Sequence, residues 1–343
     1  MEPHETVPRL DADLDLRSES QLETDYHALG DRYPAFGKFG VDLGNTSLME
    51  IPHSGTGARV LAKCEWENPE RSIKDRVAYA LLGDALRLWG ERPLDDLRIL
   101  EYSGGNLSRA IAALSHGLGL RAKVILSDFS PRSLLDDLDR YGVEVELVPK
   151  EKGFYEVINT ARRIAADDPG WTFLYQHRNP VNIYFHEATT GAETLRQLHG
   201  RRPAAWVASI GTGGSLIGVW RALKRRHPDV RAVGVTPAEL PYGADHAPDT
   251  RPKYAGSGGM GYGVRQPFIS TYEDDVEHHS VSYPDCLETM ASFFDETGVR
   301  IGSSAAANLV IARRIAERAP EHQVVATVFP DTGTPEEWKR LGR

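Results

Sequence analysis

The chain has 343 residues, of which 41% are hydrophobic and 26% charged, a composition typical of a soluble globular protein with one large or two moderate domains. Its net charge of −9, with the basic residues scattered along the chain, argues against a nucleic-acid partner. The chain lacks an apolar run of the ~18 residues that a membrane helix needs, and its two cysteines form neither a disulfide framework nor a zinc cluster, which favours a cytoplasmic protein without a metal.

The first 34 residues are acidic and polar, and they lack both sustained periodicity and the apolar core of a secretory signal. This composition predicts an arm that is partly ordered against a partner subunit.

From Pro34 onward, short apolar runs alternate with amphipathic stretches. The apolar runs predict strands over residues 59–64, 97–102, 123–127, 143–148, 204–210, 230–236 and 323–330. The amphipathic stretches predict helices over residues 75–89, 107–118, 131–141, 155–166, 183–198, 215–226 and 304–318. This alternation predicts an α/β protein whose mostly parallel sheets are flanked by helices.

A lysine stands where one of these helices begins. Lys74 closes the run Asn-Pro-Glu-Arg-Ser-Ile-Lys, in which Asn-Pro starts a turn. Burial near a positive helix end lowers the pKa of an amine, so Lys74 is a candidate nucleophile toward an aldehyde. The alternative is an ordinary solvated lysine.

Two glycine-containing turns also join a strand to a helix. The first carries Ser103, Gly104, Gly105, Asn106 and Leu107, and its exposed N–H groups could hold a carboxylate. A helix N-cap explains it equally well. The second carries Gly211, Thr212, Gly213, Gly214 and Ser215 and is suited to a phosphate, although an ordinary tight turn fits too. Neither a P-loop nor a dinucleotide glycine motif is present.

Taken in order, these segments resemble the pyridoxal-phosphate-dependent cysteine synthase and cystathionine β-synthase family, whose motifs are N-P-x-x-S-x-K-D-R, S-G-N-T-G and G-T-G-G-T. Further similarity runs from about Val41 to Gly333. It includes the sequences LGNTSL at 43–48, QHRNPVN at 176–182, HEATTGAE at 186–193, GGMGYG at 258–263, GSSAA at 302–306 and PDTG at 330–333.

The resemblance implies fold type II of the pyridoxal-phosphate enzymes, with two domains that each contain a mostly parallel sheet flanked by helices. Residues 1–34 would be the polar arm. Residues 35–67 and 181–343 would form the larger cofactor domain, and residues 68–180 a smaller mobile domain with the substrate-carboxylate loop. The resemblance also implies a homodimer and small amino-acid substrates.

The resemblance implies these site residues. Lys74 would hold the cofactor as a Schiff base and move the Cα proton, and Asn106 would contact the ring hydroxyl. Ser303 would meet the ring nitrogen, where a helix N-cap is a compatible second role. The phosphate would be held by Gly211, Thr212, Gly213, Gly214 and Ser215. The substrate carboxylate would be bound by Ser103, Gly104, Gly105, Leu107 and Gln176.

The expected reaction is β-replacement on O-acetyl- or O-phospho-L-serine through an aminoacrylate, which gives cysteine or another β-substituted alanine. A neutral serine at the ring nitrogen would leave that nitrogen poorly protonated and favour β-elimination. Gly104 and Leu107 replace a serine and a threonine of ordinary cysteine synthases. An amine nucleophile, giving a 2,3-diaminopropionate-type product, is therefore one alternative. Threonine synthase or dehydratase chemistry and a binding protein without turnover are others. The long loop of residues 237–265 carries His246, Arg251, Lys253 and Arg265, one of which could hold a phosphate leaving group. The alternative is an ordinary solvated loop with exposed charges.

Overall fold

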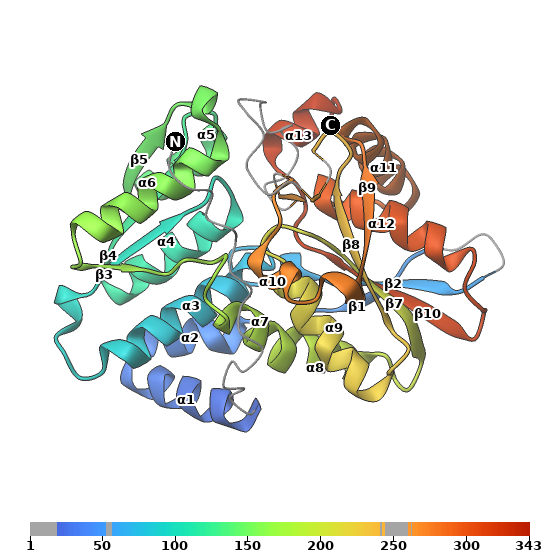
Figure 1. Cartoon of the computed structure of the whole chain (residues 1–343), viewed down its shortest axis with the longest axis horizontal. Helices are drawn as coiled ribbons and strands as arrows, with labels where there is room; N and C mark the ends of the chain where they lie inside the picture. The colour runs from blue at the N-terminus through green and yellow to red at the C-terminus, as the bar shows by residue number, and fades with distance from the viewer. Residues whose placement is uncertain (1–18, 53–56, 241, 244–259, 262) are drawn as a thin grey trace.

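The computed structural model describes residues 19–52, 57–240, 242–243, 260–261 and 263–343, and it contains two sheets. In the larger sheet every neighbouring pair is parallel except β1 and β2. Its strands, in spatial order, are β1 (Leu48–Glu50), β2 (Arg59–Cys64), β10 (Gln323–Phe329), β7 (Arg202–Ser209), β8 (Arg231–Pro237) and β9 (Val276–Val281). Figure 1 shows this sheet in the right half of the molecule.

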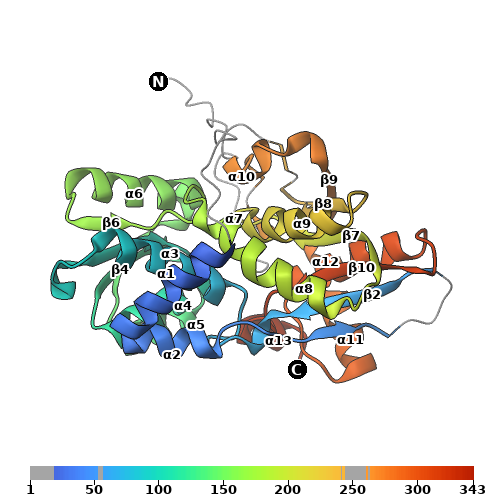
Figure 2. The same ribbon diagram turned by 90° about the horizontal axis from the view of Figure 1, so that it is seen from below.

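Helices cover both faces of the six-stranded sheet (Figure 2). Helices α11 (Tyr283–Thr297) and α12 (Ser303–Ala316) lie on one face, where they bury Val207 and Val233. Helix α9 (Gly214–Arg226) lies on the other and buries Trp206 and Ala232. Successive side chains of a strand point to opposite faces, so a strand covered on both sides needs the continuous apolar run that predicted it.

The smaller sheet is entirely parallel, with the order β5 (Glu144–Val148), β4 (Arg121–Ser127), β3 (Arg98–Tyr102) and β6 (Trp171–Phe173). Helices α3 (Lys74–Trp89) and α4 (Asn106–Leu118) share one core with Ile99 of β3. Helix α6 (Gly153–Asp167) packs with Leu100 and Ile125 in another, and α5 (Arg132–Arg140) packs beside β4. The α/β class with two mostly parallel sheets flanked by helices is confirmed.

The N-terminal part of the chain differs from the predicted arm. Helix α1 occupies Glu19–Arg32, and Tyr26 and Leu29 on it are buried. The Tyr26 hydroxyl donates to the Ala80 carbonyl at 2.7 Å, which fastens α1 to α3. Helix α2 (Pro34–Asp42) packs against α3 and α4, beside the smaller sheet, whereas the prediction placed residues 35–67 with the larger domain. Helix α1 was not predicted because its few apolar side chains, in an acidic stretch, give only a weak helical periodicity of hydrophobic residues. Residues 1–18 lie outside the described part.

Several elements were not predicted; all but α11, which has 15 residues, are short or lie at an edge of a sheet. They are strands β1, β6 and β9 and helices α10 (Pro267–Ser270), α11 and α13 (Pro335–Arg340).

The predicted helix 183–198 is present as α7 (Val181–His186), a π-helical turn (Glu187–Gly191) and α8 (Ala192–Gln197). Helix α7 contacts both α3 and α9, so it joins the two halves of the molecule. Among the described residues, no helix has the length and apolar character needed to cross a membrane.

Candidate active site

The candidate site lies where the carboxyl ends of the parallel strands meet. Strands β2, β10, β7 and β8 run in the same direction, so the segments that follow them emerge at one edge of the larger sheet (Figure 1). Ligands of open α/β sheets bind at this edge. The segments carry Lys74 after β2, Asp331 after β10 and residues 211–215 after β7.

Lys74 is the first residue of α3 and is half-buried. Burial lowers the pKa of its ammonium to about 8, although the nearby Asp331 carboxylate acts in the opposite direction. The preceding residue, Ile73, donates its backbone N–H to the carbonyl of Pro330 at 2.9 Å, which holds the start of α3 against the end of β10. The lysine therefore has a substantial neutral fraction near neutral pH, as a nucleophile or proton carrier needs.

Asn106 connects the two sheets beside this lysine. Its Nδ2 donates to Oδ2 of Asp331 at 2.7 Å, and its Oδ1 accepts a bond from Arg109 at 3.2 Å. The other carboxylate oxygen of Asp331 accepts from the N–H of Gly333 at 2.9 Å. Burial raises the pKa of Asp331. The sequence analysis predicted that Asn106 and Lys74 belong to one site. It did not identify Asp331 as a site residue, although Asp331 lies within the motif PDTG.

The glycine turn before α9 has no room for a side chain at two of its positions. Gly213 has a φ of 88°, and a Cβ added to it would lie 2.7 Å from Cδ1 of Ile269. A Cβ on Gly214 would lie 2.2 Å from Oδ1 of Asn182. The Thr212 hydroxyl accepts from the N–H of Gly214 at 3.2 Å and from Nδ2 of Asn182 at 3.1 Å. Glycine is thus required here for close approach as well as for the turn.

The donor set of this turn fits a phosphate. Helix α9 begins at Gly214, and the first N–H groups of a helix have no intrahelical partner and carry partial positive charge. The hydroxyl of Ser215 stands in the same turn, and that residue is partly exposed. Oδ1 of Asn182 and Oγ of Ser304 are buried and have no hydrogen-bond partner among the described residues. Buried polar atoms of this kind are normally satisfied. The amide oxygen of Asn182 accepts only, so its partner is a donor such as water and not the phosphate itself.

Ser303 begins α12 and is fully buried, and its hydroxyl donates to Oε1 of Glu337 at 2.5 Å. Glu337 is also the third residue of α13, where it forms a capping box with Thr334. Burial raises the pKa of the Glu337 carboxyl. The sequence reasoning missed Glu337. The pattern Thr-Pro-Glu-Glu could have revealed the capping box, but not its contact with a serine 34 residues away in the chain.

The predicted substrate loop is only partly available to a ligand. Ser103, Gly104 and Gly105 are half-buried, and the Ser103 hydroxyl accepts from the N–H of Gly105 at 3.3 Å. The prediction that Leu107 lines the substrate site is wrong for its side chain. That side chain is 1% exposed and packs in the core between α3, α4 and β3, because an isobutyl group gains more from burial than a hydroxyl would.

Gln176 positions this loop from the turn that follows strand β6. Its side-chain Nε2 donates to the carbonyl of Tyr102 at 2.8 Å, immediately before the loop. Its backbone N–H donates to the Glu101 carboxylate at 3.2 Å, and its carbonyl accepts from Asn182 at 3.0 Å. Asn182 in turn reaches Thr212, so one chain of hydrogen bonds connects the loop after β3 to the glycine turn after β7.

A buried ionic network supports the helix that carries Lys74. Arg76 donates from Nε to Glu65 at 2.7 Å, and its Nη1 and Nη2 reach the two carboxylate oxygens of Glu193, each at 2.8 Å. Lys63 contacts Glu193 at 2.8 Å, and the Thr46 hydroxyl donates to Glu65 at 2.8 Å. These residues come from α3, the short 3-10 helix η1 (Glu65–Glu67), α8, β2 and the turn before β1. The sequence reasoning recognised their motifs but not the network.

The long loop of residues 237–265 is only partly described. His246, Arg251 and Lys253 lie outside the described residues, as do residues 258, 259 and 262 of the glycine sequence at 258–263. Arg265 lies 3.6 Å from Glu273, so its cation faces a carboxylate of the same chain. Gly261 has a φ of 67°, and a Cβ there would lie 2.5 Å from the Ile210 carbonyl, just before the glycine turn. No group of three acidic, histidine or cysteine side chains in the described ranges could hold a metal ion.

Comparison with known proteins identifies the family of the chain and its structural relatives. Residues 41–331 match the family model of pyridoxal-phosphate dependent enzymes. The chain is 28% identical to a cysteine synthase of Staphylococcus aureus, with 85% of the chain and 92% of that protein covered. It is 29% identical to cysteine synthase B of Campylobacter jejuni, with 84% and 93% covered. Its fold is similar to a mutant of O-ureido-L-serine synthase with O-ureido-L-serine bound, with a TM-score of 0.77, 27% identity, and 88% and 91% covered.

Proposed function

The chain belongs to the family of pyridoxal-phosphate-dependent enzymes, and we propose that it replaces the β-substituent of an activated L-serine. The substrate class is O-acetyl- or O-phospho-L-serine, and the product is cysteine or another β-substituted alanine. One observation carries the proposal. A half-buried lysine with a pKa of about 8 stands at the edge where the glycine turn, Asn106 and Ser303 are expected to hold the cofactor. Similarity to two cysteine synthases supports the reaction class.

The bound cofactor supplies an electron sink for negative charge that develops at the substrate Cα. Lys74 would hold the cofactor covalently and, once displaced by the substrate amine, take the Cα proton on Nζ. Burial suits it to this role, because an amine with a pKa of about 8 both accepts and returns a proton near neutral pH. Asp331 beside it favours the protonated state and so holds the proton after transfer.

Other side chains would fix the positions of the reactants. The N–H groups of residues 211–215 and the Thr212 and Ser215 hydroxyls would bind the cofactor phosphate. Ser303 would face the ring nitrogen and Asn106 the ring hydroxyl. Ser103, Gly104 and Gly105 would bind the substrate carboxylate through N–H groups, with Gln176 holding their loop. The Asn106–Asp331 bond joins the two sheets across the site, and such contacts exclude water when the halves approach each other.

A second candidate uses the same first half-reaction with an amine as the nucleophile. The loop of Ser103, Gly104, Gly105, Asn106 and Leu107 favours it, because glycine and a core-facing leucine provide no hydroxyl to the substrate site. The similarity to O-ureido-L-serine synthase also supports a nucleophile other than sulfide. Threonine synthase or dehydratase chemistry remains a third alternative.

The test is the mass of the product formed by the purified holoenzyme. Each activated serine, O-acetyl and O-phospho, is combined with sulfide, a second thiol and a panel of amines, and Lys74→Ala serves as the blank. We expect a β-substituted alanine from one donor and one class of nucleophile. Formation of only a 2-oxo acid, or of no product with any pair, would contradict the proposal.

We further propose that the enzyme is a cytoplasmic homodimer, on the basis of the family resemblance. Size-exclusion chromatography with light scattering measures the mass of the assembly. A monomer that keeps full activity would contradict the dimer.

A further inference from the structure

A second hollow lies at the opposite edge of the six-stranded sheet, where the parallel strands begin. Its volume is about 620 Å³. Arg202, Arg231 and Gln323 open strands β7, β8 and β10, so they lie at the amino ends of these strands, whereas Lys74 and the glycine turn follow carboxyl ends. The hollow is therefore a separate site from the one proposed for the cofactor.

Cationic side chains dominate the lining of the hollow. Four arginines and two histidines face two carboxylates, namely Arg202, Arg231, Arg314, Arg318, His227, His279, Asp229 and Glu277. With the histidines neutral, four positive and two negative charges leave a net charge of +2. The net charge of the whole chain is −9, so the lining of the hollow has the opposite sign of charge from the chain as a whole. Positive potential in a concave surface attracts anions.

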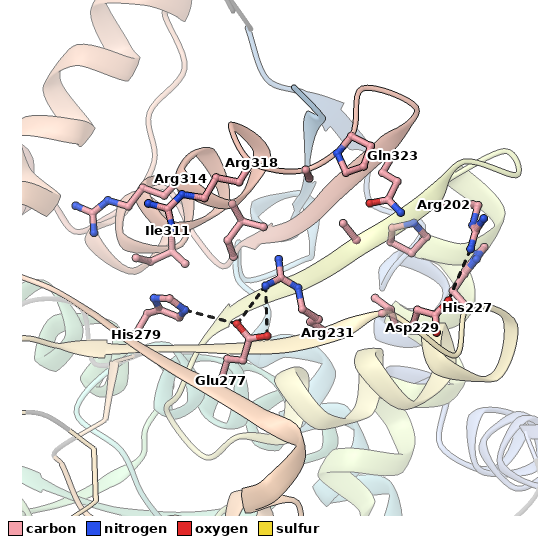
Figure 3. Close-up of a pocket in the computed structure, with 16 residues that line it drawn as sticks. Arg202, His227, Asp229, Arg231, Glu277, His279, Ile311, Arg314, Arg318 and Gln323 are labelled. Atoms are coloured by element: carbon pink, nitrogen blue, oxygen red, sulfur yellow. Dashed lines mark hydrogen bonds and ion pairs between the residues drawn. The ribbon is translucent and has the colours of Figure 1, made fainter. Parts of the chain in front are cut away.

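The two carboxylates leave part of this charge uncompensated. Arg202 lies 3.8 Å from Asp229, and Arg231 lies 3.3 Å from Glu277. Arg314, on α12, and Arg318, in the turn that follows this helix, are exposed, and within the described residues neither has a carboxylate partner. Figure 3 shows Arg231 in the middle of the hollow, with Glu277 on one side and Arg202 and Asp229 on the other, while Arg314 and Arg318 lie above them.

Apolar side chains complete the lining and indicate an organic ligand. Ile311 and Ile315 line the hollow from α12, as Arg314 does, and Arg318 lines it from the turn that follows this helix. Pro203 and Val230 contribute from the strand side. Guanidinium groups bind carboxylates and phosphates in a two-pronged geometry, and a net charge of +2 suits two negative charges. We propose that this hollow binds a small organic dianion with carboxylate or phosphate groups.

The experiment measures binding to the holoenzyme by isothermal titration calorimetry at constant ionic strength. Succinate and glycerol 3-phosphate are the probes, one for each anion chemistry. In Arg314→Gln/Arg318→Gln we expect the affinity to fall at least about tenfold, because one charge-assisted hydrogen bond contributes about a decade or more. In Glu277→Gln we expect the affinity to rise, because a competing carboxylate is removed. A misfolded variant does not produce such a gain.

The matched control is Lys150→Gln/Lys152→Gln, which removes the same charge from two exposed positions beside the smaller sheet. It should keep the affinity of the wild type. The visible absorbance of the cofactor should stay unchanged during the titration, which separates this site from the cofactor site. Equal loss of affinity in both double variants would indicate general charge screening and would overturn the proposal. Absence of saturable binding of both probes to the wild type would also overturn it.

Discussion

The hydroxyl of Ser303 gives its hydrogen to Glu337, a carboxylate that is buried on the C-terminal helix α13. A hydroxyl has one hydrogen and two lone pairs, so Ser303 in this arrangement presents lone pairs to its other neighbours. If the ring nitrogen of the cofactor lies beside Ser303, the serine accepts a hydrogen bond from it and favours its protonated form. The sequence-based expectation was instead a poorly protonated ring nitrogen beside a neutral serine.

We therefore predict that Glu337→Gln lowers the pH midpoint at which the visible absorbance of the cofactor changes. Glutamine can donate to Ser303, which frees the serine hydrogen for the ring nitrogen and destabilises the protonated ring. Glutamine also retains the capping interaction, so the loss of stability should be about 1 kcal/mol or less. Glu336→Gln removes the same charge from the neighbouring residue and serves as the control. An equal shift in both variants would show that Glu337 has no specific role.

Replacement of Lys74 by alanine should abolish covalent attachment of the cofactor. We expect borohydride treatment to fix the cofactor to the wild type but not to Lys74→Ala, as detected by peptide mass spectrometry. Turnover should fall by roughly a thousandfold or more, since the proton carrier is lost as well. Lys150→Ala, at an exposed position, should behave as the wild type. A reduced cofactor adduct on any other lysine would refute the assignment.

The glycine turn before α9 gives a test that separates backbone strain from cofactor binding. Gly213 and Gly142 both have positive φ, at 88° and 70°, so alanine costs about 1–2 kcal/mol of strain at either position. Only at Gly213 would the new Cβ meet a neighbour, Ile269. We expect both variants to melt at lower temperature, but only Gly213→Ala to bind the cofactor more weakly in an equilibrium titration. Equal cofactor affinity in the two variants would remove Gly213 from the phosphate site.

The buried ionic network predicts a specific acid sensitivity. Contacts with Arg76 and Lys63 lower the pKa of Glu193 to about 2, despite the opposing effect of burial, whereas an unperturbed glutamate has a pKa of 4.5. The network therefore contributes stability that is complete above about pH 4.5 and is lost as the pH falls toward 2. The contribution is about 3 kcal/mol at about 1.4 kcal/mol per pKa unit.

Denaturant unfolding at a series of pH values measures this effect. In Glu193→Gln the free energy of unfolding should be lower at neutral pH and should fall less steeply between about pH 4.5 and 2 than in the wild type. Glu296→Gln, which breaks an exposed pair with Arg313, should keep the slope of the wild type. The same slope in all three proteins would show that Glu193 does not couple protonation to folding.

The amino-acid sequence by itself determined the α/β class and most of its strands and helices. Strands such as β7 and β10 are buried on both faces and must be apolar throughout, so they are visible as short uninterrupted runs. It also indicated Lys74 and the glycine turn, because a reactive amine at a helix start and glycines at a strand-to-helix turn are local features. Helix α1 was not predicted, because only a few apolar side chains pack it against the rest of the protein.

Only the tertiary structure decided which distant residues meet. The contact of Ser303 with Glu337 joins positions 34 apart, the bond of Asn106 to Asp331 joins positions 225 apart, and Arg76 reaches Glu193 over 117 residues. Leu107 stands in the middle of a ligand-binding pattern, yet its side chain turns into the core. Local periodicity reports which face of an element is buried. It cannot report which charged or polar side chain of another element lies opposite, because the packing of the two sheets and their helices sets that pairing.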